Sequence, residues 1–489
     1  MTISTEQRLL ASIPTQLLVN GVWQDSATGL KFAVDDPATG AELTTVADAS
    51  AVDARAAMDA AASTQASWAA TAPRDRADIL RRAFELVHAS AEDFALLITL
   101  EMGKTLAEAR AEVNYGAEFL RWFSEEAVRT EGRYTPAPDG NARLLVTKKP
   151  VGPSLLITPW NFPLAMATRK LAPAIAAGCT SIIKPAPLTP LTTLLLAKIM
   201  IEAGVPAGVV NVIPTSTAAS TVAPLIADPR LRKLSFTGST EVGRKLLAQA
   251  APTVLRTSME LGGNAPFLVF EDADLDAAIE GALAAKLRNI GQACTAANRF
   301  YVHEDVADAF ATKLADRFAA KHIGRGTEDG VEIGPLIDEP SRSKVHGLVE
   351  EALGSGATAI AGGVPLPGPG WFYPPTVLTN VPAGARILSE EIFGPVAPIA
   401  TFRTEKQAIA LANATPYGLA AYAYTKDLSR VLRLTEQLET GMLGINAGVI
   451  SNPAAPFGGV KQSGLGREGG REGIEEYLET MYVGISNPR

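Results

Sequence analysis

One cysteine of the sequence lies where it could act as a nucleophile. Cys294 follows a predicted helix within Gly291–Thr295 (GQACT) and precedes a predicted strand, Phe300–His303. The reactive form of cysteine is the thiolate, and an unperturbed thiol has a pKa of about 8.5. Backbone N–H groups of a glycine-containing loop would lower that value. Because buried cysteines are more often structural than reactive, the chemical interpretation depends on the polar residues that accompany Cys294.

Two polar residues at predicted strand ends could complete such a site. Glu260 follows the predicted strand Val254–Met259 and precedes two glycines, and a partly desolvated glutamate can act as a general base. Asn161 lies between two prolines after the predicted strand Leu155–Thr158, and a carboxamide held in this way can donate to an oxyanion. Each residue alone would more often be a solvated charge, a helix cap or a turn residue.

Two segments are candidates for binding phosphate. Lys184–Pro187 follows one predicted strand, and Phe236–Gly243 joins a predicted strand to a helix, whose N-terminus favours a pyrophosphate. The glycines of the second segment, Gly238 and Gly243, fit neither the G-x-G-x-x-G fingerprint nor the P-loop.

The histidines show no spacing typical of a metal site, and we expect no bound metal. They are His88, His303, His322 and His346. A hydrolase that pairs a cysteine with a histidine stays open at this point, because such partners need only be close in space.

Hydrophobic periodicity predicts the elements that position these residues. Helices are expected over Ala51–Ala70, Arg74–Leu100 and Ala107–Val128. From Val151 onwards, short strands alternate with helices, which is typical of a parallel, doubly wound α/β sheet. The expected strands are Leu155–Thr158, Ser181–Lys184, Val209–Ile213 and Lys233–Thr237.

A second alternating stretch runs from Ala265 to about Asn446 and predicts a second α/β domain. Within it, Asp272 and Asp274 would start a helix that ends near Asn289.

The segment 132–151 predicts a hairpin. Asp139-Gly140 lies like a turn between Arg133–Pro136 and Arg143–Lys148. Since a two-stranded arm is marginal alone, we expect it to pair with another subunit, alongside a C-terminal strand at Tyr477–Ile485.

Composition limits the class of protein. The 489 residues, 47% of them hydrophobic, predict two or more domains. A net charge of −8 without a basic cluster argues against nucleic acid or an anionic membrane as a partner. Two cysteines are too few for a disulfide framework and no signal-peptide pattern is evident, so we expect a cytoplasmic protein. The uncharged segment Ser355–Ala385 contains six prolines, which forbid a continuous membrane-spanning helix.

Taken in order, the motifs resemble the aldehyde dehydrogenase superfamily over essentially the whole chain. They are Thr158–Pro163, Lys184–Ala186, Phe236–Ser239, Glu260–Gly263, Gly291–Cys294, Glu390–Pro395 and Pro456–Gly464. The resemblance implies an aldehyde dehydrogenase-like fold with two doubly wound α/β domains. The expected divisions are an NAD(P)-binding domain (1–131 and 152–259), a catalytic domain (260–446) and an oligomerisation arm (132–151 and 470–489) that forms a homodimer or homotetramer.

The same resemblance implies roles for single residues. Cys294 would be the nucleophile, Glu260 the general base and Asn161 the oxyanion donor, while Lys170 and Glu468 match positions proposed to relay a proton. Cofactor contacts are implied for Trp160, Lys184, Gly238, Ser239, Leu261, Glu391 and Phe393. Pro187 stands where NAD-preferring relatives usually have Glu, so the cofactor is expected to be NADP or NAD, with NADP favoured.

Within the superfamily, the sequence is most similar to succinate-semialdehyde dehydrogenases. Arg169, Arg288 and Ser451 match the positions that bind the distal carboxylate of the substrate in that subfamily. A second cysteine that forms a redox switch in some members is replaced here by Ala296. The alternatives are a glutarate-semialdehyde or broad-range dehydrogenase, a CoA-acylating dehydrogenase, a non-catalytic protein of the same fold, and a surface position for both arginines.

Overall fold

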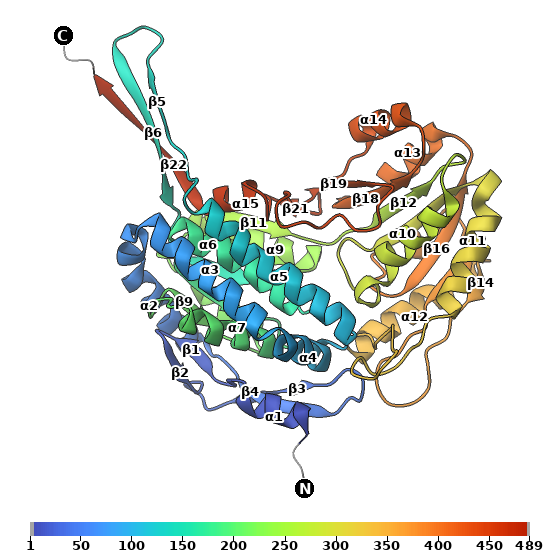
Figure 1. Ribbon diagram of the computed structural model, residues 1–489, viewed down its shortest axis with the longest axis horizontal. Helices are drawn as coiled ribbons and strands as arrows, with labels where there is room; N and C mark the ends of the chain where they lie inside the picture. Colours follow the sequence, from blue (N-terminus) through green and yellow to red (C-terminus); the bar gives the residue numbers. More distant parts are fainter. Residues whose placement is uncertain (1–3, 487–489) are drawn as a thin grey trace.

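The computed structural model describes residues 4–486 and contains two separate, mainly parallel sheets (Figure 1). The first has eight strands in the order β2-β1-β9-β8-β7-β10-β11-β21. Its five central strands are parallel: β9 (Val210–Val212), β8 (Ser181–Lys184), β7 (Ser154–Ile157), β10 (Lys233–Thr237) and β11 (Arg256–Glu260). The first four are buried along their whole length, as strands covered on both faces must be. The expected α/β class is confirmed.

Short antiparallel strands lie at both edges of this sheet and were not predicted. β1 (Leu17–Val19) and β2 (Val22–Gln24) extend one edge. β21 (Gly464–Leu465) pairs with β11 at the other edge. Two or three residues are too few to show a periodic pattern in a sequence.

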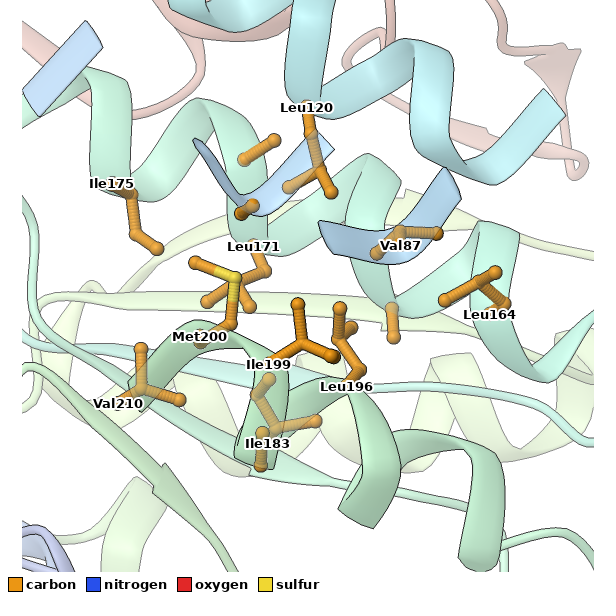
Figure 2. Packing of buried hydrophobic residues seen from close by; sticks show 14 of the residues in the cluster. Val87, Leu120, Leu164, Leu171, Ile175, Ile183, Leu196, Ile199, Met200 and Val210 are labelled. Atoms are coloured by element: carbon orange, nitrogen blue, oxygen red, sulfur yellow. The ribbon is translucent and has the colours of Figure 1, made fainter. Parts of the chain in front are cut away.

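Helices cover both faces of the first sheet. Alternate strand residues face opposite clusters, so Leu156 and Ile183 pack in one core while Ile157 and Ile182 pack in the other. The first core holds α3 (Pro73–Ala89), α4 (Ala91–Met102), α5 (Leu106–Glu126), α6 (Pro163–Ala177) and α7 (Leu191–Glu202), and Figure 2 shows part of its packing. The second holds α2 (Ala51–Ala70), α8 (Ala218–Ile226) and α9 (Thr240–Ala250).

The predicted helix Arg74–Leu100 was wrong in one respect, because the structure divides it at Ser90. Ser90 leaves the helical conformation (φ −104°, ψ 20°) and separates α3 from α4. The sequence has neither glycine nor proline at this point, so it carries no strong signal for the break.

The second sheet has seven strands in the order β14-β15-β16-β13-β12-β18-β19, of which only β14 is antiparallel to its neighbour. The strands are β12 (Ala265–Val269), β13 (Ala297–His303), β14 (Thr358–Ala361), β15 (Thr376–Thr379), β16 (Val396–Phe402), β18 (Ala420–Tyr424) and β19 (Met442–Ile445). One face packs against α10 (Leu275–Leu287), α11 (Glu304–Ala319) and α12 (Glu339–Gly354), and the other against α13 (Glu405–Asn413) and α14 (Leu428–Gln437).

The two aspartates that were expected to begin α10 have different roles in the structure. Asp274 caps the helix by accepting from the backbone N–H of Ala277. Asp272 instead accepts from Thr425, from two backbone N–H groups of the loop that follows β18, and from Arg430. Only Asp274 therefore acts as a helix cap.

A three-stranded arm extends from the body of the molecule (Figure 1). It contains the expected hairpin, β5 (Arg133–Pro136) and β6 (Ala142–Pro150), with β22 (Leu478–Ser486) along the other side of β6. The C-terminal strand begins one residue later than predicted.

The remaining described elements are short. They are α1 (Thr5–Ser12), the hairpin of β3 (Lys31–Asp35) and β4 (Glu42–Ala47), the pair of β17 (Tyr417–Gly418) and β20 (Val460–Lys461), and α15 (Glu472–Glu475). Over residues 4–486, no helix has the length and apolar character needed to cross a membrane.

Candidate active site

Cys294 lies in the loop that joins the C-terminus of α10 to strand β13 of the second sheet. Before it, the backbone is left-handed at three consecutive residues, Asn289, Ile290 and Gly291 (φ 55°, 59° and 74°). This conformation is unfavourable for a β-branched residue, and such strain is concentrated at functional sites. The loop brings Cys294 against Gly263, where a Cβ would lie only 2.3 Å from the carbonyl oxygen of Cys294.

The thiol of Cys294 is neutral in this environment. Burial raises its pKa to about 12, and the negative charges of Glu391 and Glu260 add to that effect. The positive charges of Arg169 and Arg288 act in the opposite direction but do not overcome burial. The expectation that the loop would lower this pKa is therefore wrong for the structure described. A nucleophilic role requires a base that takes the proton.

Glu260 is a buried carboxylate at the last position of β11, with 3% of its surface exposed. Neither of its oxygens has a hydrogen-bond partner among residues 4–486. Burial, reinforced by the negative charge of Glu468, raises the pKa of Glu260 well above its usual range. A Cβ at Gly458 would lie 2.9 Å from Oε1, so the glycine leaves room for the carboxylate. A carboxylate with no structural partner is available for proton transfer.

Asn161 faces the same cleft as Cys294 and Glu260 from the turn after β7. Its Nδ2 donates to the carbonyl oxygen of Gln292 at 2.9 Å, and within the described chain its Oδ1 has no partner. Because an amide NH2 carries two hydrogens, one remains for an oxygen atom in the cleft. The cleft thus brings together Asn161 and Glu260, which follow or end strands of the first sheet, and Cys294 from a loop of the second. These three groups are suited to acyl chemistry.

Lys170, Arg169 and Glu468 form a buried cluster behind Glu260. Glu468 Oε1 lies 2.5 Å from Lys170 Nζ, and Oε2 lies 2.5 Å from Arg169 Nε. Lys170 also donates to Ser235 Oγ at 2.9 Å. Burial alone would raise the pKa of Glu468, but Lys170 and Arg169 lower it below the usual value. The structure therefore brings the two predicted relay residues together and joins Arg169 to them.

The segment Phe236–Gly243 forms the junction of β10 and α9, and its first glycine and serine line the cleft. Ser239 caps α9, because its Oγ accepts from the backbone N–H of Val242 at 3.3 Å. Gly243 serves packing, since a Cβ there would lie 2.4 Å from Leu261 Cδ2. The glycine spacing that matched no phosphate fingerprint thus has a local explanation. The N-terminus of α9 suits a pyrophosphate.

Glu391 and Phe393 also line this cleft. Glu391 Oε1 accepts from the backbone N–H of Gly263 at 3.1 Å, and burial raises the pKa of Glu391 to about 7. The ring of Phe393 meets that of Trp160 edge to face, with centroids 5.4 Å apart. A cleft that combines a helix N-terminus, two aromatic rings and a carboxylate fits a dinucleotide.

Lys184 and Pro187 lie at the carboxyl end of β8. Lys184 is 4% exposed, and burial lowers its pKa to about 8. Thr189 Oγ1 donates to the carbonyl oxygen of Trp160 at 3.3 Å, which ties the turn containing Pro187 to the cleft. Neither residue lines the cleft that contains Cys294.

A second pocket contains Arg288 and Ser451 together with Tyr115 and Phe162. The guanidinium of Arg288 lies over the ring of Phe162 at 5.0 Å and makes no hydrogen bond or ion pair with residues 4–486. Arg169 is placed differently, because it is 1% exposed, pairs with Glu468 and lies over the ring of Phe457 at 4.1 Å. Of the three residues expected to bind a carboxylate, the structure brings two into one pocket. Arg169 is therefore not a surface charge, whereas Arg288 is partly exposed at the end of α10.

Sequence reasoning missed the residues that hold Asn161. Its carbonyl oxygen accepts from Lys104 Nζ and from Asn289 Nδ2, each at 3.0 Å, and Lys104 pairs with Glu112. A lysine after a helix and a glutamate within one resemble surface charges in a sequence, so no pattern distinguishes them. Among residues 4–486, no group of three or more His, Cys, Asp and Glu side chains is arranged to hold a metal ion.

A family model described as "Aldehyde dehydrogenase family" matches residues 23–483. The chain is 64% identical over 446 residues to succinate-semialdehyde dehydrogenase from Paenarthrobacter nicotinovorans, covering 91% of this chain and 99% of that protein. It is 49% identical over 468 residues to glutarate-semialdehyde dehydrogenase from Pseudomonas aeruginosa, covering 96% and 97%. The crystal structure of an NADP-dependent enzyme from E. coli superposes with a TM-score of 0.96 at 51% identity, covering 97% and 98%.

Proposed function

Because the chain belongs to the aldehyde dehydrogenase family, we propose that it oxidises succinic semialdehyde to succinate through a thioester on Cys294, with NADP or NAD as cofactor. The observation that carries the substrate is the unpaired guanidinium of Arg288 in a pocket shared with Ser451. Arg288 is partly exposed and has no ion-pair partner among the described residues, so its guanidinium is free to bind a ligand that brings a carboxylate.

The first steps form a bond between sulfur and the aldehyde carbon. Cys294 loses its proton to Glu260, whose carboxylate has no other partner, and the thiolate attacks the carbonyl carbon. The remaining N–H of Asn161, with the backbone N–H of Cys294, stabilises the oxyanion that results. When bound in the cleft, the nicotinamide supplies the acceptor for the hydride that leaves this carbon.

The second half hydrolyses the thioester. Glu260 first releases the proton of the thiol to solvent and then takes a proton from water, the hydroxide adds to the thioester carbon, and the thiolate of Cys294 leaves as the acid forms. Glu468, held by Lys170 and Arg169, keeps a negative charge near Glu260 and favours the protonated form of that residue. The raised pKa of Glu260 means that it binds a proton more readily than an ordinary carboxylate does, which suits a general base.

The cofactor is bound by groups that each suit one part of it. Ser239 and the N-terminus of α9 would bind the pyrophosphate, and Glu391 would bind the hydroxyls of the nicotinamide ribose. Lys184, at the end of β8, would contact the adenosine ribose. Pro187 presents no carboxylate to a 2′-phosphate, which supports NADP as the favoured cofactor, and the 51% identical E. coli structure is of an NADP-dependent enzyme.

The arm suggests assembly into a homodimer or homotetramer. It projects from the body and carries exposed Tyr134, Met481 and Tyr482, which a partner subunit would cover. The two free cysteines support a reducing, cytoplasmic location. Light scattering of the intact chain and of a variant without β22 tests the first proposal, because loss of the strand should yield a smaller species.

Steady-state kinetics with three aldehydes test the substrate. Succinic semialdehyde, glutarate semialdehyde and butanal are compared with NADP and with NAD in wild type, Arg288→Gln and the surface control Arg81→Gln. We expect Arg288→Gln to raise KM for the charged aldehydes about 10- to 100-fold and to leave butanal within about 3-fold, since one charge-assisted contact contributes about 1.5–3 kcal/mol.

Each other outcome points to one alternative. Preference for the five-carbon semialdehyde would make glutarate semialdehyde the substrate, and equal rates with butanal would indicate a broad-range enzyme. A requirement for CoA would indicate an acylating dehydrogenase. Full activity of Cys294→Ala would contradict the mechanism itself.

A further inference from the structure

We propose that the buried ion pair of Lys104 and Glu112 is a positioning device that holds Asn161 in place as the oxyanion donor. This inference rests on the aldehyde oxidation proposed above, although not on which aldehyde is used. It assigns a role to two residues that also border the pocket of Arg288 and Ser451 and that take no part in the proposed chemical steps.

Lys104 joins the turn that carries Asn161 to the helical layer. Its Nζ lies 2.5 Å from Glu112 Oε2 and 3.0 Å from the carbonyl oxygen of Asn161, and it lies 4.1 Å from the centre of the Phe162 ring. Both charged side chains are fully buried. The contact therefore acts on the peptide group of the oxyanion donor itself.

Glu112 holds the other end of the same short segment. Its Oε1 accepts from the backbone N–H groups of Leu164 and Ala165, at 3.0 and 3.3 Å, in the first turn of α6. Asn161 lies three residues before Leu164, so Lys104 and Glu112 form hydrogen bonds with the two ends of the same turn. A displacement of either end would move the carboxamide of Asn161.

The loop that carries Lys104 is itself fixed by the other half of the molecule. Leu106 N–H donates to the carbonyl oxygen of Gly326 at 3.0 Å, and a Cβ at Gly334 would lie 2.0 Å from the carbonyl oxygen of Gly103. This segment precedes α12, which packs on the sheet that bears Cys294. Through Lys104, the oxyanion donor Asn161 is therefore held in a fixed position relative to the sheet that carries the Cys294 loop.

A second buried glutamate shows that capping a helix does not require a lysine. Glu101 accepts from the backbone N–H groups of Leu191 and Thr192 at the start of α7, at 2.8 and 2.9 Å. It forms no ion pair within the described chain. Because a buried ion pair is costly to desolvate, the lysine beside Glu112 is better explained by its additional contact with Asn161.

A double-mutant cycle between Lys104 and Asn161 tests the proposal. Lys104→Met keeps the alkyl stem and removes the donor, and we expect kcat to fall about 10- to 100-fold while KM for butanal, which carries no charge, stays within about 3-fold. In the Asn161→Ala background, which itself lowers kcat about 10²- to 10³-fold, the same change should alter kcat less than about 2-fold. A full additional loss in that background would overturn the proposal.

Two further variants separate position from stability. Glu101→Gln is the matched control, and it should change the melting temperature without changing kcat per folded molecule. Lys104→Met/Glu112→Gln removes both charges, so it should recover much of the stability lost in Lys104→Met while kcat remains low. Recovery of kcat together with stability would show that the pair is only structural. Each rate is measured with succinic semialdehyde and with butanal, so failure of the substrate proposal would leave the cycle readable.

Discussion

Glu260 and Glu468 are neighbouring buried carboxylates with opposite surroundings. Glu468 has a lysine and an arginine, each 2.5 Å away, which lower its pKa, whereas Glu260 has no partner among the described residues and a raised pKa. Burial raises the pKa of both carboxyl groups, so the opposite net shifts of their pKa values follow from the different neighbours. The group left without a partner is the one available for chemistry, and the paired one sets the field in which it works.

The largest effect should come from the unpaired member. Glu260→Gln removes the base but no existing hydrogen bond, so we expect kcat to fall about 10²- to 10⁴-fold with no loss of thermal stability. Rapid-quench kinetics together with calorimetry measure both quantities. A clear drop in melting temperature with a nearly normal kcat would reverse the comparison and make Glu260 structural.

The paired member should respond in the opposite manner. Glu468→Gln leaves Arg169 and Lys170 buried without a counter-charge, and the free energy of unfolding should fall by about 3–5 kcal/mol. Chemical denaturation measures this change, with Glu439→Gln at the surface as control. The pH at which kcat is half-maximal should also move to lower values, because one negative charge near Glu260 is lost. An unchanged free energy of unfolding would mean that Glu468 is not needed to compensate the buried charges of Arg169 and Lys170.

Glu391 is a third buried carboxylate, and its effect on stability should depend on pH. Its folded pKa of about 7 lies above the ordinary 4.5, so the folded chain holds a proton that the unfolded chain has released between these values. Stability without cofactor should therefore be highest at low pH in that window and fall as pH rises to about 7. Glu391→Gln should be about 1–3 kcal/mol more stable than wild type at pH 8 and equal to it near pH 4. Thermal unfolding at both pH values checks this, and a difference that grows toward acid would contradict the assigned direction.

Much of the site could be predicted because strands of a parallel sheet end at the same edge. Asn161, Lys184, Gly238 and Glu260 each lie at or just after the end of a segment predicted as a strand, and in the structure each lies at or shortly beyond the carboxyl end of a strand. The sequence did not predict the hydrogen bonds that hold Asn161, since Lys104 and Glu112 meet it only through tertiary packing.

Arg169 and Arg288 illustrate the same limit. Their side chains are identical in type, and the family motif assigned both to substrate, yet one is buried against Glu468 and the other lies open to a pocket. Pairing between distant residues decides this difference, and 299 residues separate Arg169 from Glu468 in the chain. Local spacing cannot report such a partner.

The arm has a consequence for biosynthesis. Its central strand β6 ends at Pro150, but the strand that covers its second side, β22, begins at Leu478. At translation rates of about 5–20 residues per second, roughly 15–65 s pass before the missing strand is made. During that interval β6 presents an unpaired edge, which other chains could join. The arm is completed only after Ser486 has been made, so assembly through all three of its strands must wait for the more than 300 residues between β6 and β22.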